Sequence, residues 1–269
     1  MVACSTHLVA GNPSVAGQQL AELNAFLEPY RQAGRRVYMM GDFNLDRPPY
    51  GSLDQAVRIP GGVRVAGWVT DPEQVAPIDL HAYIGPYGYN TGVANGYRAD
   101  VRPAHPQQGG YHGFGVSIAN TLPAGNYSTC AWGINAGGGS NATVGCTALD
   151  YQVDPIGAFG PVTVGWGFVN VKGWTIDPDT AAAVPVHVYT SSTITWGGTL
   201  GTPGAAGTNT GNASVYRADI AAWFPAWGGN HGLDANVSSP TGHKYACGYA
   251  INTAGQGGDH LLGCTQYLP

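Results

Sequence analysis

Four consecutive residues, Gly41-Asp42-Phe43-Asn44, combine side-chain types that suit phosphate chemistry. They follow the apolar run 36–40, which reads as a strand. Because side chains alternate along a strand, Asp42 and Asn44 point to the same face. A carboxylate and an amide presented together at the end of a strand can hold a metal-activated water and a phosphate oxygen. The motif therefore points to hydrolysis of a phosphate ester.

A strand, a helix and a second strand are expected to position this motif. Residues 3–8 read as a strand that ends in Thr6-His7-Leu8. Residues 14–33 read as a helix, because apolar side chains recur there every three or four positions. The segment thus contains a strand ending in Thr-His-Leu, then a helix, then a strand ending in Gly-Asp-Phe-Asn. This order resembles the endonuclease/exonuclease/phosphatase superfamily, which includes the DNase I-like hydrolases. The resemblance implies that residues 1–55 are a truncated α+β piece, strand-helix-strand, of a DNase I-like sandwich.

The same resemblance implies catalytic roles for three residues. Asp42 matches the carboxylate that orients and deprotonates the attacking water, and Asn44 matches the amide that contacts the scissile phosphate or its metal. His7 matches the imidazole that steadies phosphate charge in the transition state. A phosphodiester substrate and Mg²⁺, or another divalent metal, are implied with them. The alternative is that His7 is a half-buried polar residue at a strand end and Asp42 a turn-forming carboxylate.

The catalytic set is incomplete by the family's pattern. The family has a metal-binding glutamate on an early strand, and no such strand precedes Val2. It also has an Asp-His pair near its end, whereas Asp259-His260 falls in a loop of an unrelated repeat. Mg²⁺ would be held weakly without these groups, so the chain as it stands is expected to be inactive. Residues 1–55 are also too few to bury a core unaided, so either they pack on the next module or the chain is the tail of a longer gene product, and the second is favoured.

The rest of the chain is an internal duplication, with a first copy over 56–150 and a second over 156–269. The motifs Gly-Trp, Asp-Pro, His-x-Tyr, Tyr-Arg-x-Asp, His-Gly and Cys-x-aromatic-x-Ile-Asn recur in the same order. Alternating β-branched runs, punctuated by Gly, Pro and Asn, indicate strands. We expect a mainly β chain with two tandem antiparallel β-sandwich modules. The pattern resembles a repeat appended to secreted bacterial hydrolases, which has no settled activity.

Four of the five cysteines occupy matching positions in the two copies. This placement predicts the disulfides Cys130–Cys146 and Cys247–Cys264, each within its own copy. Closing loops of this length stabilises a fold by about 3 kcal/mol. Disulfides belong to oxidising compartments, so we expect an extracellular or cell-envelope protein, although Met1 begins inside a strand and no signal peptide is present in this chain. A zinc site is the alternative, but no Cys-x-x-Cys pair supports it.

Other polar residues also match between the copies. Arg98 and Asp100, like Arg217 and Asp219, are two residues apart on one face of a strand and are expected to form local ion pairs. Four histidines recur in matching pairs and are expected to make structural hydrogen bonds, with ligand contact as the alternative: His81, His112, His187 and His231.

Composition limits the partners. Charged residues make up 10% of the chain and its net charge is −5, without a basic cluster. Binding of nucleic acid by the β modules is therefore not expected. No apolar run approaches twenty residues, so no membrane span is expected. Three tryptophans of the second copy lack a counterpart in the first and could form a stacking platform for a sugar: Trp196, Trp223 and Trp227.

Two functions compete at this point. The first is the C-terminal part of a secreted, metal-dependent phosphodiester hydrolase, nuclease- or phosphatase-like, that carries two accessory β modules and is inactive as the chain stands. The alternative is a non-catalytic cell-envelope or polysaccharide-binding protein that uses the paired β modules. The sequence does not determine a substrate, because loops set specificity on a shared scaffold.

Overall fold

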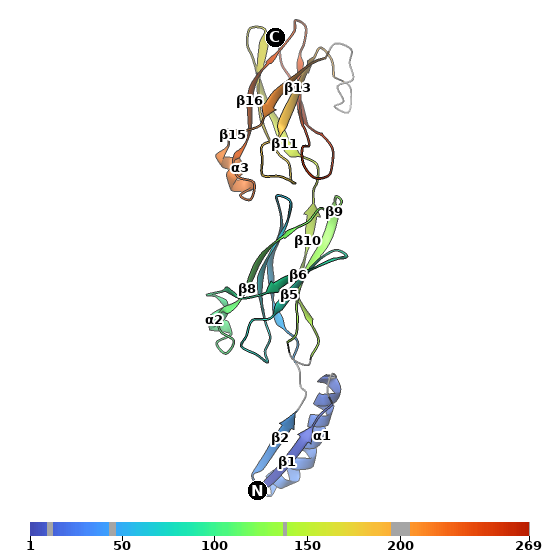
Figure 1. Ribbon diagram of the computed structural model, residues 1–269, viewed down its shortest axis with the longest axis vertical. Coiled ribbons are helices and arrows are strands. Elements are labelled where there is room, and N and C mark those ends of the chain that lie inside the picture. Colours follow the sequence, from blue (N-terminus) through green and yellow to red (C-terminus); the bar gives the residue numbers. More distant parts are fainter. Residues whose placement is uncertain (10–12, 43–46, 137–138, 195–204, 269) are drawn as a thin grey trace. The chain divides into compact units, whose positions relative to one another are not determined.

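The computed structural model describes residues 1–9, 13–42, 47–136, 139–194 and 205–268. Strands dominate these ranges, and the order of the elements along the chain can be followed in Figure 1. The expectation of a mainly β protein is confirmed. No described helix is both long enough and apolar enough to cross a membrane.

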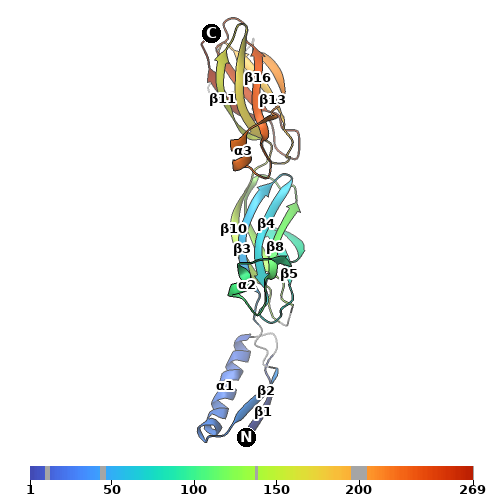
Figure 2. The same cartoon turned by 90° about the vertical axis from the view of Figure 1, so that its left-hand side faces the viewer.

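The N-terminal segment is a strand-helix-strand unit, as expected. Strand β1 (Val2–His7) pairs in parallel with β2 (Val37–Asp42), and helix α1 (Pro13–Gln32) connects them. The helix lies along the two-stranded sheet in both views (Figures 1 and 2). Gly34, at a φ of 71°, follows the helix in a left-handed conformation that glycine adopts without strain.

A DNase I-like sandwich is not supported by this segment. Described residues 1–42 form a two-stranded sheet with one helix, whereas that fold needs two packed sheets. The next strand, β3 (Tyr50–Ile59), pairs with β4 (Gly62–Thr70) and so belongs to an antiparallel sheet of the first repeat. The range 1–55 therefore includes the first residues of the β repeat.

The two repeats are built from equivalent strands. In the first, named repeat A, the remaining elements are β5 (Asp79–Ile84), β6 (Tyr87–Val93), β7 (Gly96–Tyr97), α2 (Val101–Ala104), β8 (Tyr111–Ala119), β9 (Gly125–Gly133) and β10 (Ala142–Tyr151). In the second, named repeat B, they are β11 (Ile156–Val164), β12 (Phe168–Ile176), β13 (Pro185–Ser191), β14 (Ala206–Asn212), β15 (Val215–Tyr216), α3 (Ala218–Trp223), β16 (Asn230–Ser238), β17 (Tyr245–Ala250) and β18 (His260–Gln266).

Their connectivity is the same. Over the described residues, repeat A has sheets ordered β3-β4-β8-β7 and β10-β9-β5-β6, and repeat B has sheets ordered β11-β12-β16-β15 and β14-β13-β17-β18. If the strands of each repeat are numbered from its first, both repeats give the orders 1-2-6-5 and 8-7-3-4, the latter read backwards in repeat B. The predicted tandem β modules are therefore confirmed at the level of topology.

Strand alternation explains where the core of each repeat lies. Along β13, Val186 and Val188 are buried, whereas the alternating residues His187 and Tyr189 are on the outer face. In repeat B the core joins buried side chains of both sheets: Val169, Val171, Val186, Val188, Ala213, Leu233, Val237, Ala246, Ala250, Leu262 and Tyr267. The two sheets thus pack face to face as a sandwich, and the side chains on their outer faces point away from the core.

The chain divides into two compact units. Unit 1 comprises residues 1–56, 65–116 and 128–148, and unit 2 comprises residues 57–64, 117–127 and 149–269. Inside unit 2, Arg58 forms an ion pair with Asp179, and the two side chains are only 9% and 7% exposed.

The Arg58 guanidinium makes further contacts within unit 2. It donates hydrogen bonds to the carbonyl oxygens of Ile59 (3.0 Å) and Gly62 (2.9 Å), and its central carbon lies 3.9 Å from the centroid of the Tyr151 ring. Asp179 accepts a further hydrogen bond from the backbone N–H of Gln256 (3.1 Å). This charge is buried but paired, which is the condition under which burial is tolerated.

Candidate functional site

The predicted catalytic residues His7 and Asp42 lie at the same end of the two-stranded sheet. They are register partners of β1 and β2, and His7 Nε2 is 3.6 Å from an Asp42 carboxylate oxygen. Their side chains are 73% and 64% exposed, so water screens the interaction. Asn44 lies outside the described residues. The catalytic roles of all three stay predictions.

The expected Mg²⁺ has no ligand set in the part of the chain that the structure describes. No group of three or more His, Cys, Asp or Glu side chains there could hold a metal ion. One imidazole and one exposed carboxylate do not provide the oxygen ligands that Mg²⁺ requires. No chemical step through a metal is therefore derived.

The structure describes two of the three tryptophans of the predicted platform. Trp223, at the end of α3, is 67% exposed. Trp227 is half-buried: its indole N–H donates to the carbonyl of Asp177 (3.1 Å), and its ring packs edge-on against Phe224. Trp196 lies outside the described residues. Trp227 thus contributes packing, and sugar stacking by the three tryptophans stays a prediction.

Both predicted disulfides form. Cys130 on β9 is bonded to Cys146 on β10, and Cys247 on β17 is bonded to Cys264 on β18. Each joins two neighbouring strands of one sheet. These covalent links fit an extracellular protein.

The predicted ion pairs also form, within each repeat. Arg98 Nε donates to Asp100 (2.8 Å), and Arg217 Nε donates to Asp219 (2.9 Å). The hydrogen bond from Arg98 lowers the pKa of Asp100 to about 2, and the one from Arg217 does the same for Asp219. Because these carboxylates are engaged with a neighbouring guanidinium, we assign the pairs a local structural role.

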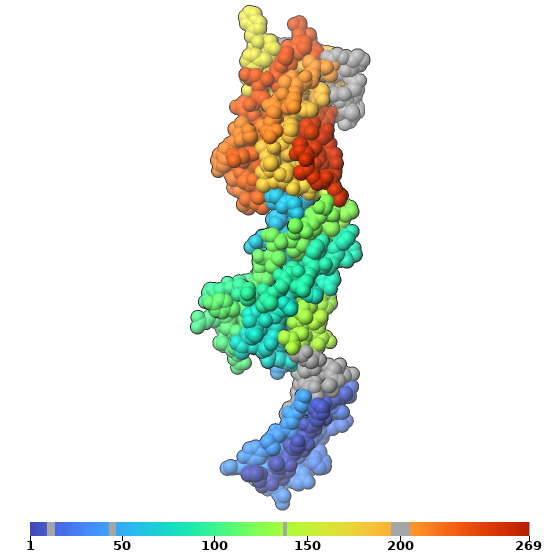
Figure 3. Space-filling view, viewed as in Figure 1, coloured from blue at the N-terminus to red at the C-terminus, as the bar shows by residue number. Residues whose placement is uncertain are grey.

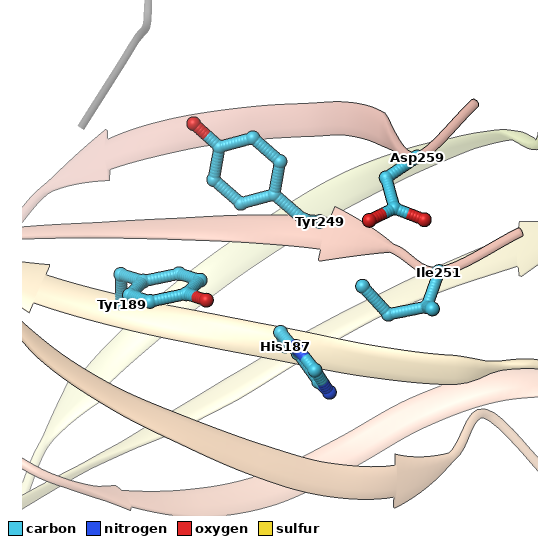
Figure 4. Close-up of a pocket in the computed structure, with 5 residues that line it drawn as sticks. All are labelled: His187, Tyr189, Tyr249, Ile251 and Asp259. Atoms are coloured by element: carbon cyan, nitrogen blue, oxygen red, sulfur yellow. The ribbon is translucent and has the colours of Figure 1, made fainter. Parts of the chain in front are cut away.

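An aromatic hollow on the outer face of one sheet recurs in both repeats. Cradle A, in repeat A, is a hollow of about 460 Å³ lined by Tyr83, Gly85, Ser128, Cys130, Trp132 and Asn141. Cradle B, in repeat B, is a hollow of about 320 Å³ lined by His187, Tyr189, Tyr249, Ile251 and Asp259. Figure 4 shows cradle B. Strand β13, which carries His187 and Tyr189 of this cradle, has the gold colour of the bar in Figure 3 and reaches the surface there.

Strand register builds the same aromatic pair in each cradle. Tyr83 on β5 faces Cys130 on β9, just as Tyr189 on β13 faces Cys247 on β17. Two residues after each cysteine comes a second aromatic ring on the same face, Trp132 in repeat A and Tyr249 in repeat B.

The rings of each pair meet edge to face. Their centroids are 6.3 Å apart for Tyr83 and Trp132 and 5.8 Å apart for Tyr189 and Tyr249, with interplanar angles of 71° and 89°. Edge-to-face packing at such distances is a favourable arrangement for aromatic side chains. In Figure 4 the two tyrosines of cradle B come from neighbouring strands, with His187 beside Tyr189 on β13.

A glycine on the other neighbouring strand makes room for the first ring of each pair. Tyr83 is paired with Gly88 of β6, and Tyr189 with Gly207 of β14. A Cβ atom would lie 2.9 Å from the Tyr83 ring at Gly88 and 2.6 Å from the Tyr189 ring at Gly207. Both distances are below van der Waals contact, so glycine at these positions allows each ring to lie close over the adjacent strand.

One polar residue closes each cradle at its edge. In repeat A the side-chain oxygen of Asn141 accepts a hydrogen bond from the backbone N–H of Asn135 (2.9 Å). In repeat B a carboxylate oxygen of Asp259 accepts one from the backbone N–H of Asn252 (3.0 Å). Asn141 and Asp259 are therefore structurally equivalent, although their chemistry differs.

A buried aspartate anchors the loop behind each cradle. Asp71 accepts hydrogen bonds from the backbone N–H groups of Glu73 (2.9 Å) and Ala136 (3.2 Å). Asp177 accepts one from the N–H of Asp179 (2.9 Å) and is placed 3.5 Å from that of Thr253. The loop that carries Asn141 or Asp259 is thereby tied to the end of β4 or β12.

We expect Asp177→Asn to change the pH dependence of stability. Burial raises the pKa of Asp177 above its ordinary value. A raised folded-state pKa gives stability that is fully present below the unfolded pKa and is lost as the pH rises through the folded pKa. The asparagine side chain of the variant does not ionise at this position. Its free energy of unfolding, measured with urea, should therefore improve relative to the wild type as the pH is raised from about 4, near the ordinary pKa of an aspartate, toward neutral. A difference that is constant across this range would contradict the expectation.

The two cradles have the composition of a binding site for a small polar ring. Each offers aromatic faces, a polar side chain at the rim and a hollow close to the size at which small-molecule sites begin. Neither contains a nucleophile with an adjacent base among its described lining residues. The arrangement is suited to binding a ligand of this kind.

Sequence reasoning did not single out the cradles, although their residues lay in the repeated motifs. His-x-Tyr and Cys-x-aromatic-x-Ile-Asn were each visible twice. The missing information was the register that places Tyr83 beside Trp132 and Tyr189 beside Tyr249. The recurrence of an aromatic residue at both positions was the signal that could have identified them.

Comparisons with known proteins give no family. No protein-family profile and no curated protein match the chain. Similar solved structures include a tetra-tandem repeat in the extending region of a large adhesion protein, at 12% identity and a TM-score of 0.27, covering 82% of this chain and 49% of that chain. A DUF3823 family protein from Bacteroides ovatus has 10% identity and a TM-score of 0.27, with 82% and 97% coverage. The chain spans about half the length of the adhesion structure, and at these TM-scores neither likeness carries a functional argument.

The predicted membership of residues 1–55 in the endonuclease/exonuclease/phosphatase superfamily is wrong. No profile of that family matches, and the described residues 1–42 form one two-stranded sheet rather than the two packed sheets of that fold. The likeness rested on two short motifs, Thr6-His7-Leu8 and Gly41-Asp42-Phe43-Asn44. Many strand-helix-strand units can carry such motifs, because polar residues at strand ends are common in turns. The likeness of the β modules to a hydrolase-appended repeat is equally unsupported.

Proposed function

We propose that the chain is a non-catalytic, extracellular or cell-envelope protein that binds polysaccharide through cradles A and B. One observation carries this proposal: the same edge-to-face aromatic pair, in the same register, lines a hollow on the outer sheet face of both repeats. Tyr83 is 39% exposed, so part of its ring is open to a ligand.

Stacking explains why a sugar suits these cradles. One face of a pyranose ring presents C–H groups, which pack against an aromatic ring with loss of apolar surface. The hydroxyl groups around the sugar can hydrogen-bond the polar rim residues Asn141 and Asp259. The low content of charged residues, 10%, fits a ligand that is recognised by stacking rather than by strong electrostatic attraction.

Duplication supports a polymeric ligand. Two cradles on one chain can engage two segments of the same polysaccharide, and the second binding event then becomes intramolecular. Weak individual sites suffice under this arrangement, which fits shallow hollows better than deep pockets. The intrachain disulfides agree with function outside the reducing cytosol.

The proposal predicts that the tyrosines of the cradles carry retention on an insoluble polysaccharide. The purified chain should sediment with peptidoglycan or chitin. Tyr83→Ala or Tyr189→Ala should each weaken binding by about thirtyfold, because truncation of an aromatic anchor costs on the order of 2 kcal/mol. The double variant should lose measurable binding. Depletion of the chain from the supernatant, measured over a range of polymer concentrations, gives the affinities.

Two other tyrosines serve as matched controls. Tyr97 on β7 and Tyr216 on β15 are 54% and 65% exposed, but they belong to the other sheet of each repeat. Tyr97→Ala and Tyr216→Ala should bind like the wild type. Failure of the wild-type chain to bind any wall polymer, or equal losses in the control variants, would remove the support for cradles A and B as sugar sites.

A further inference from the structure

The two cradles differ in charge at one equivalent position. Asn141 and Asp259 occupy the same place, because each accepts the backbone N–H of the asparagine that follows the equivalent strand. Asn141 is neutral, and the described residues that line cradle A include no ionisable carboxylate. Asp259 places a carboxylate in cradle B.

The Asp259 carboxylate is available to a ligand. Its side chain is exposed, and it forms no ion pair with a lysine or arginine in the described part of the chain. In Figure 4 it stands over the same hollow as Tyr249 and Ile251.

We infer that cradle B selects a sugar that carries a protonated amino group, whereas cradle A takes a neutral sugar. This inference rests on the proposed function. In cradle B an ammonium group on a ring stacked against Tyr189 would form a charge-assisted hydrogen bond with Asp259, and the electron-rich tyrosine faces would add a cation–π contribution. An N-acetylated sugar offers the same ring without the charge. In cradle A the Asn141 amide can bond an acetamido or hydroxyl group equally well.

The test compares two oligosaccharides of equal length, a glucosamine tetramer and an N-acetylglucosamine tetramer, on the full chain at neutral pH. Isothermal titration calorimetry, with NMR chemical shifts to report which cradle responds, gives the affinity at each site. Cradle B should bind the glucosamine tetramer roughly tenfold more tightly than the N-acetylated one, because a hydrogen bond to a charged group is stronger than one to a neutral group. Added salt should reduce this preference.

Reciprocal variants make the assignment specific. Asp259→Asn should remove the preference of cradle B for the glucosamine tetramer, because the amide carries no charge but can still accept the hydrogen bond from the backbone N–H of Asn252. Asn141→Asp should create the same preference in cradle A. A preference that survives Asp259→Asn, or equal affinity of cradle B for both tetramers, overturns the inference while binding itself upholds the proposed function. No binding of either tetramer by any variant, together with no retention on a wall polymer, overturns both.

Discussion

Asp179→Ala is expected to lower the free energy of unfolding of unit 2 by about 3–5 kcal/mol. The change leaves the Arg58 guanidinium, whose side chain is 9% exposed, without its counter-charge in a site that water barely reaches. It also leaves the backbone N–H of Gln256 without its acceptor. Urea unfolding, followed by tryptophan fluorescence because Trp227 packs in the same unit, gives the difference.

Two comparisons separate the lost charge pairing from other causes. Asp219→Ala removes an aspartate from an exposed pair with Arg217, and its free energy of unfolding should stay close to that of the wild type. The double variant Arg58→Met with Asp179→Leu replaces both charges by apolar groups and should recover most of the loss. If Asp179→Ala unfolds at the wild-type midpoint, the pair does not hold a buried charge and the description of unit 2 is incorrect at this point.

Removal of the Cys247–Cys264 disulfide is the second large effect that we expect. Cys247→Ala with Cys264→Ala should reduce the free energy of unfolding of repeat B by about 3 kcal/mol, because the bond closes a loop of 17 residues and restricts the unfolded chain. The same loss should follow reduction of the wild type. Denaturant midpoints measured with and without a reducing agent test both statements.

The free thiol supplies the control for that measurement. Cys4→Ser changes a cysteine of β1 that belongs to no disulfide, and it should leave the unfolding of repeat B unchanged. Reduction should have no further effect on a variant that lacks all four paired cysteines. If the oxidised and the reduced wild type unfold at the same denaturant concentration, the disulfides do not contribute to the stability of the sheet.

Much of the β architecture could be predicted from the sequence because the chain contains two copies of the same set of motifs. Matching motifs gave two copies, and matching cysteines gave the pairing Cys130–Cys146 and Cys247–Cys264, since a disulfide inside each copy preserves the repeat. The ion pairs of Arg98 and Arg217 followed from spacing alone. Local spacing determines these features, which is why one sequence sufficed.

The functional sites could not be predicted in the same way. The hydrolase hypothesis came from short motifs around His7 and Asp42. These two side chains lie 3.6 Å apart, but such a pair at the end of a two-stranded sheet does not establish a family. The cradles depend on which residues face each other across β5 and β9 or across β13 and β17. Register of that kind is set by the whole sandwich and cannot be read from a single strand.

The placement of the disulfides has a mechanical consequence for a protein exposed to pulling forces. Each bond joins directly neighbouring strands, so a repeat that unfolds under tension cannot extend the chain between its two cysteines. For Cys247 and Cys264 the 17-residue separation withholds roughly 55 Å of contour length, at about 3.3 Å per extended residue. An oxidised repeat therefore releases less contour length when it unfolds under load than a reduced repeat does. Single-molecule force spectroscopy would detect the oxidation state of the surrounding medium as a change in the length of the unfolding step.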